Sequence, residues 1–115
     1  MSGQDFHRLE LILRIVGHLH RRLDPLSLET FLTDVDEIDL TAFRLSVIGE
    51  TTATLSDALK ARNPSIHWPS IYGMRNAIVH DYGAIEPGRL WAVFTKDVEP
   101  LAEVCRAELG RAESA

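Results

Sequence analysis

Apolar side chains recur at spacings of three and four residues through most of this chain, and this periodicity restricts its fold more than any other feature. Such spacing lines one face of an α-helix with apolar groups, whereas a half-buried strand requires strict alternation. The sequence shows no strand-like alternation, no glycine-rich phosphate loop and no internal repeat. It therefore predicts an all-α fold in which amphipathic helices share one core.

Proline-containing pairs divide this pattern into separate helices. Asp24-Pro25 ends the first helix, Asn63-Pro64 ends the long third one, and Glu86-Pro87 opens the last, because proline stops a helix but suits its first turn. The predicted helices cover residues 5–23, 27–33, 36–62, 69–80 and the segment after residue 86. Three longer and two shorter helices with short connections predict an up-and-down bundle of about four to five helices.

Three positions carry more local predictions. Gly49 lies inside the long third helix, where glycine costs about 1 kcal/mol relative to alanine, so we expect another helix to pack closely against it. Pro100 lies within the last helix and should kink it. The tail from Gly110 should be frayed.

Composition limits the classes of function. At 115 residues the chain forms one domain, residues 1–115. No apolar run approaches the roughly 20 residues that span a bilayer, and the N-terminus lacks the plan of a signal peptide, so we expect a cytoplasmic protein with no membrane contact. The single cysteine, Cys105, is predicted to be a small buried hydrophobic residue.

Charge is distributed unevenly. The net charge of −5 argues against a broad cationic coat for nucleic acid, so any RNA contact must be local. Residues 1–23 are basic and form the better candidate for a rim that faces phosphate, whereas residues 24–50 are acidic and suit a protein partner or solubility. His18 and His20 lie about 200° apart on a helix and are predicted to be solvated rather than joint metal ligands.

The stretch from Tyr72 to Tyr82 gathers the groups best able to handle a phosphate or a proton. Helical geometry places Tyr72, Asn76 and His80 on one stripe, with His80 near the helix C-terminus and Gly83 as a left-handed stop. Arg75 lies on a neighbouring face, within reach on its long side chain. Spacing alone leaves a simpler interpretation open, in which Arg75 pairs with an acid and His80 caps backbone carbonyls.

The motif Arg-x4-His-x-Tyr, here Arg75, His80 and Tyr82, resembles the signature of the HepT-like toxins of the HEPN ribonuclease superfamily. The segments Ile48-Gly49-Glu50-Thr51-Thr52 and Ile71-Tyr72-Gly73-Met74-Arg75-Asn76 are also similar to stretches of that family. The chain departs from the family in the order of residues around Trp68, where His67 precedes it and Pro69 follows. The resemblance extends over nearly the whole chain.

The resemblance implies a HEPN-like bundle that forms a homodimer, with the motif helices of two chains facing one cleft. Cleavage of RNA by attack of its own 2′-hydroxyl needs a general base and a general acid. Two His80 side chains across a two-fold axis could supply them, because a histidine with an unperturbed pKa near 6.5 can serve in either role. Arg75 would stabilise the charge on the phosphorane, and Asn76 would orient the imidazole or the phosphate. This chemistry requires no cofactor.

The resemblance further implies that the chain is the toxin of a toxin–antitoxin system. A nucleotidyltransferase antitoxin would transfer AMP onto the hydroxyl of Tyr82, placing bulky negative charge beside His80 and Arg75. A tyrosine packed on the last helix is the simpler expectation from position alone. Two other classes stay open. One is a non-catalytic helical module that binds a nucleotide or a protein in the same cleft, and the other is a metal-binding bundle, for which His7 and Glu10 have one-face spacing but no Glu-x-x-His pair of the di-iron type occurs.

Overall fold

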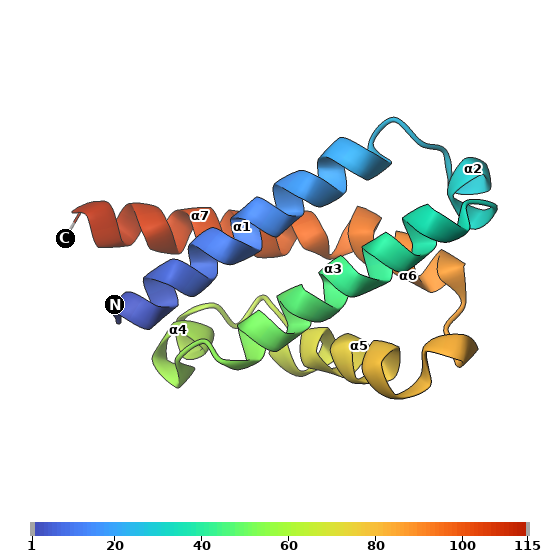
Figure 1. The fold of residues 1–115 in the computed structure, drawn as a ribbon. Helices are drawn as coiled ribbons and strands as arrows, with labels where there is room; N and C mark the ends of the chain where they lie inside the picture. The colour runs from blue at the N-terminus through green and yellow to red at the C-terminus, as the bar shows by residue number, and fades with distance from the viewer. Residues whose placement is uncertain (1, 115) are drawn as a thin grey trace.

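The computed structural model describes residues 2–114, and within that range the chain is all-α (Figure 1). The elements are α1 (Gly3–Leu23), α2 (Leu28–Leu32), α3 (Val35–Ala53), α4 (Asp57–Arg62), α5 (Trp68–Asp81), the 3-10 helix η1 (Tyr82–Ala84), α6 (Pro87–Lys96) and α7 (Val98–Ser114). The fold class predicted from the periodicity is confirmed.

The long helices form an elongated bundle of 46 × 29 × 21 Å. α1 packs against α3 and α7, and α5 packs along α3 on its other side (Figure 1). The short helices α2 and α4 turn the chain at opposite ends of α3, and α6 leads back into α7 (Figure 1). Because α3 lies between α1 and α5, it is the element that fixes the position of the motif helix.

One continuous core holds these helices together. Its fully buried side chains include Leu9, Ile12, Phe31, Leu59 and Ala102 from four different helices. Cys105 is buried in this core, as predicted, and burial raises the pKa of its thiol to about 12. The thiol is therefore protonated at neutral pH and serves as packing.

The long third helix predicted over residues 36–62 is wrong, because the chain breaks between Ala53 and Asp57 into α3 and α4. The buried carboxylate of Asp5 on α1 accepts hydrogen bonds from the backbone N–H of Ser56 at 3.0 Å and from its hydroxyl at 2.6 Å. Ser56 also caps α4. The apolar period continues through the break, so spacing alone could not reveal a tertiary contact made by Asp5.

The last predicted helix is also broken, at Asp97, three residues before the proline that was expected to kink it. Pro100 has no N–H to donate to the carbonyl of Lys96, and its ring would clash with that carbonyl. α6 therefore ends at Lys96, and Pro100 occupies the first turn of α7, where a missing N–H costs nothing. The predicted kink is a full break.

Three smaller predictions are corrected. Gly83 does not adopt a left-handed conformation, because no glycine of residues 2–114 has a positive φ, and α5 passes instead into η1. The tail is helical from Gly110 to Ser114 rather than frayed, while Ala115 lies outside the described residues. His20 is only partly solvated, because its ring contacts Asp24 at 3.0 Å and Glu99 at 3.2 Å while 37% of the side chain stays exposed.

Gly49 is confirmed as the point where α5 approaches α3 most closely. A Cβ atom at Gly49 would lie 2.5 Å from the Cβ of Arg75 and 3.0 Å from the carbonyl oxygen of Ile71. The first of these distances is shorter than the separation of two carbon atoms that are not bonded to each other. The absence of a side chain at Gly49 thus sets how closely the backbone of Arg75 approaches α3.

Replacing Gly49 with alanine is expected to lower the free energy of unfolding by about 1–3 kcal/mol, because the two helices must separate to admit the methyl group. Gly17→Ala is the matched control, because a Cβ there meets nothing within 4 Å and should stabilise α1 by about 0.5–1 kcal/mol. Urea unfolding of both variants measures the difference. Equal stability of the two variants would contradict the tight α3–α5 contact.

Candidate active site

Arg75 leaves α5 at the close contact with Gly49 and turns its guanidinium toward α3. Its Nε forms an ion pair with Glu50 Oε2 at 2.7 Å, and its Nη1 donates to Asn76 Oδ1 at 2.9 Å. The guanidinium carbon lies 5.6 Å from the centre of the Tyr72 ring, in a cation–π contact. Three neighbours therefore hold a side chain that is 24% exposed.

These contacts leave Nη2 of the guanidinium available. Among residues 2–114, Nη2 of Arg75 has no hydrogen-bond partner. The N–H groups of Nη2 can therefore donate to a phosphate, while the contacts at Nε and Nη1 hold the guanidinium in place. The alternative that Arg75 pairs with an acid is also present in the structure, because Glu50 is its partner.

Asn76 acts on Arg75 in this structure. Its Oδ1 accepts from Nη1 of Arg75, which fixes the amide so that Nδ2 points away from the guanidinium and is left without a partner among the described residues. No hydrogen bond joins Asn76 to His80 in residues 2–114. Asn76 therefore positions the arginine and presents a free donor on the same face of α5.

His80 lies one turn after Asn76, in the last turn of α5, and its side chain is exposed. Within the described residues the imidazole makes no hydrogen bond or ion pair, and no carbonyl is capped by it. Met74 and Ile78 are buried on the opposite side of the helix, while Tyr72 is 37% exposed. The predicted stripe of Tyr72, Asn76 and His80 thus faces outward from the bundle.

Tyr82 begins η1 just beyond this stripe and is held by α3. Its hydroxyl donates a hydrogen bond to Oδ1 of Asp39, and 40% of the residue is exposed. Partial burial and the neighbouring Asp39 carboxylate raise the pKa of the phenol to about 12, because both disfavour the phenolate. The hydrogen bond of the Tyr82 hydroxyl is therefore made to α3.

The structure adds two carboxylates that the sequence did not single out as site residues. Glu50 contacts Arg75 and Asp39 contacts Tyr82, eleven residues apart on α3. Both belong to the acidic segment that was expected to form a free surface. The tight α3–α5 contact predicted at Gly49 was the signal that could have identified Glu50, because the adjacent residue must lie beside α5.

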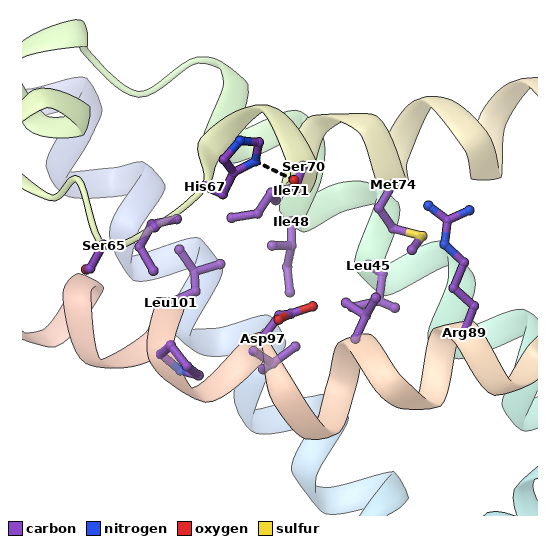
Figure 2. Close-up of a pocket in the computed structure, with 14 residues that line it drawn as sticks. Leu45, Ile48, Ser65, His67, Ser70, Ile71, Met74, Arg89, Asp97 and Leu101 are labelled. Carbon is purple, nitrogen blue, oxygen red and sulfur yellow. Dashed lines mark hydrogen bonds between the residues drawn. The ribbon is translucent and has the colours of Figure 1, made fainter.

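A cavity lies on the other side of α5. It is a cavity of about 520 Å³ between α3, α5, α6 and α7, with a floor that includes Leu45, Ile48, Met74 and Leu101 (Figure 2). At one end, Nδ1 of His67 contacts the Ser70 hydroxyl. Arg75, Asn76, His80 and Tyr82 do not line it. Arg75 instead borders a smaller surface hollow of about 260 Å³, together with Glu50 and Val79.

The histidine and glutamate side chains considered as metal ligands do not form a common site in the described residues. Nδ1 of His7 lies 3.7 Å from Glu10 on an exposed face of α1. His20 is bound by Asp24 and Glu99, away from His7 and His18 along α1. Within residues 2–114, no three His, Cys, Asp or Glu side chains are arranged to hold a metal ion.

The chain is an all-helical bundle whose α5 presents Asn76 and His80 on one outward stripe, with Arg75 on the neighbouring face. A family model described as ribonuclease HepT-like matches residues 12–108, and the chain belongs to that family. The fold therefore agrees with the resemblance noted in the sequence.

Two curated relatives cover most of the chain. "Putative RNase TTE0752" of Caldanaerobacter subterraneus subsp. tengcongensis is 27% identical over 81% of this chain and 83% of its own. "Probable ribonuclease HepT" of Thermococcus cleftensis is 26% identical over 87% of this chain and 89% of its own. No solved structure matches the chain. None of the helices in residues 2–114 has both the length and the apolar character needed to cross a bilayer.

Proposed function

We propose that this chain is the toxin of a toxin–antitoxin system and acts as a metal-independent endoribonuclease. The observation that carries the proposal is the outward stripe of α5, where an exposed His80 follows an Arg75 whose guanidinium is oriented by Glu50 and Asn76 and unpaired at Nη2. Membership of the ribonuclease HepT-like family supports the same class of substrate.

The proposed reaction requires two copies of the site. His80 of one chain takes the proton of a 2′-hydroxyl while that oxygen bonds to the adjacent phosphorus. The partner subunit's His80 gives a proton to the departing 5′-oxygen, so the products are a 2′,3′-cyclic phosphate and a 5′-hydroxyl. Arg75 donates from its free Nη2 to the phosphorane oxygens, where negative charge develops in the transition state.

The surface around Arg75 supports a homodimer through α3 and α5. Phe43 is 64% exposed and Val79 is 52% exposed, although both are apolar. Phe43 lies on α3 between Asp39, which contacts Tyr82, and Glu50, which contacts Arg75. Apolar side chains that border polar site residues are typical of an interface, and an isologous contact here would bring two α5 helices together.

The regulation that we propose acts on Tyr82. A nucleotidyltransferase antitoxin would transfer AMP to the Tyr82 hydroxyl, and the added phosphate and adenosine would occupy the approach to His80 and Arg75. The 40% exposure of Tyr82 leaves the ring open to a second enzyme. Bulky negative charge at this position would repel the RNA backbone from the site.

The test is cleavage of RNA by the purified wild-type chain with and without EDTA. We expect equal rates in the two conditions and products that end in a cyclic or 3′-phosphate, because two imidazoles and a guanidinium need no metal-bound hydroxide. Loss of cleavage in EDTA, or products with a 5′-phosphate, would contradict the mechanism. Tight RNA or nucleotide binding without any cleavage would instead favour the non-catalytic module.

A further inference from the structure

A cluster of basic side chains on α1 and α3 lies outside the site described above. We call it the basic ridge and define it as Arg14, His18 and Arg21 of α1 together with Arg44 of α3. The three α1 residues are spaced by four and three positions, which places them on one face of that helix. Arg14 and Arg21 are exposed, whereas His18 and Arg44 are half-buried where α1 packs against α3.

The basic ridge lacks the carboxylates that would neutralise it. Within residues 2–114, no acidic side chain lies within 4.0 Å of a side-chain nitrogen of Arg14, Arg21 or Arg44. The neighbouring Arg22 differs, because its Nε donates to Glu37 at 2.9 Å. The chain has a net charge of −5 and therefore carries more carboxylates than cationic side chains, yet these three arginines lie together without an acidic partner.

The cationic groups of the basic ridge are close enough to act on one another. Burial lowers the pKa of His18, and the charges of Arg21, Arg44 and Arg14 lower it further. Burial likewise lowers the pKa of Arg44, helped by Arg21 and Arg22 and opposed by Glu37. Like charges held together in this way cost stability, and a bound anion would relieve that cost.

The position of the basic ridge relates it to the candidate active site. Arg44 precedes Glu50 by six residues on α3, which corresponds to about 9 Å along the helix axis. Glu50 holds Arg75. The ridge lies on the side of α3 that packs against α1, and the α5 stripe lies on its other side, so a strand that contacts both would have to pass α3.

We propose that the basic ridge binds the phosphate backbone of single-stranded RNA and guides it toward Arg75 and His80. This inference rests on the proposed function, because it assigns the substrate a second contact outside the reacting phosphate. An RNA strand supplies the repeated negative charges that match arginines spaced along one helix face. Backbone contacts of this kind position a strand without reading its sequence.

The experiment measures binding of a fluorescent single-stranded RNA to chains that carry His80→Ala, so that cleavage does not consume the probe. Arg14→Gln with Arg21→Gln is compared with the matched control Lys96→Gln with Arg111→Gln, which removes two exposed charges from α6 and α7. We expect the ridge pair to weaken binding about tenfold or more near 0.1 M salt and to reduce the log–log salt slope by about 1.4, since each lost phosphate contact contributes about 0.7 for a single strand.

Two further readouts complete the test. Added RNA should raise the pKa of His18 measured by NMR, because an anion stabilises the imidazolium. Ridge variants that bind RNA as well as the control, or that lose self-association in sedimentation while keeping RNA affinity, would overturn the proposal. If the wild-type chain binds RNA through the basic ridge but never cleaves it, the proposed function is wrong and the RNA-binding role of the ridge stands. If the chain cleaves RNA equally well with and without the ridge arginines, the proposed function stands and the role of the ridge is wrong.

Discussion

His80→Ala is expected to lower the rate of RNA cleavage by about 10²-fold or more, because the substitution removes both the base and the acid from a symmetric site. The imidazole is exposed and has no partner within residues 2–114, so its loss should leave the fold and its stability unchanged. Single-turnover cleavage measures the rate, and circular dichroism checks the helices. His7→Ala is the matched control, because His7 is an exposed histidine on α1 whose side chain is 82% exposed.

Mixing experiments test whether one site uses two chains. Arg75→Ala should also abolish cleavage by itself, since it removes the one guanidinium of α5. Chains that carry Arg75→Ala and chains that carry His80→Ala should regain part of the activity when mixed, if groups from both copies act on one phosphate. An active monomer in sedimentation, or a His80→Ala protein that cleaves at the wild-type rate, would exclude the two-histidine mechanism.

Local signals in the sequence were sufficient for the parts of this fold that depend on local chemistry. The 3.6-residue period placed the core faces of α1, α5 and α7, and a glycine inside a helix marked the α3–α5 contact at Gly49. The stripe of Tyr72, Asn76 and His80 followed from helical geometry alone. Its outward orientation agrees with burial of Met74 and Ile78 on the other side.

The parts that were missed depend on contacts between residues distant in sequence. The break before α4 follows from Asp5, which lies 51 residues from the Ser56 that it binds. The partners of Arg75 and Tyr82 are carboxylates of α3 that appear in the sequence only as members of an acidic segment. The sequence shows how many acidic residues this segment has. Only the packing of α3 against α5 shows that Glu50 contacts Arg75 and that Asp39 contacts Tyr82.

The contact between Tyr82 and Asp39 suggests how the proposed modification proceeds. A phenol whose pKa is raised to about 12 is protonated at neutral pH, so transfer of AMP requires a group that takes the proton. Asp39 already accepts the hydroxyl hydrogen. As Oη bonds to the α-phosphorus of ATP and pyrophosphate leaves, that proton would pass to the Asp39 carboxylate.

Tyr82→Phe is therefore expected to abolish AMP transfer completely while the chain remains toxic, because the ring is kept and only the accepting oxygen is lost. Tyr72→Phe is the matched control on α5 and should be modified as the wild type is. Asp39→Asn should slow the modification without preventing it, since the amide cannot take the proton but leaves the phenol in place. Intact mass spectrometry after co-expression with the cognate nucleotidyltransferase measures the added AMP. A toxin that is fully neutralised yet unmodified would show that the antitoxin acts by covering the site rather than by changing the charge of Tyr82.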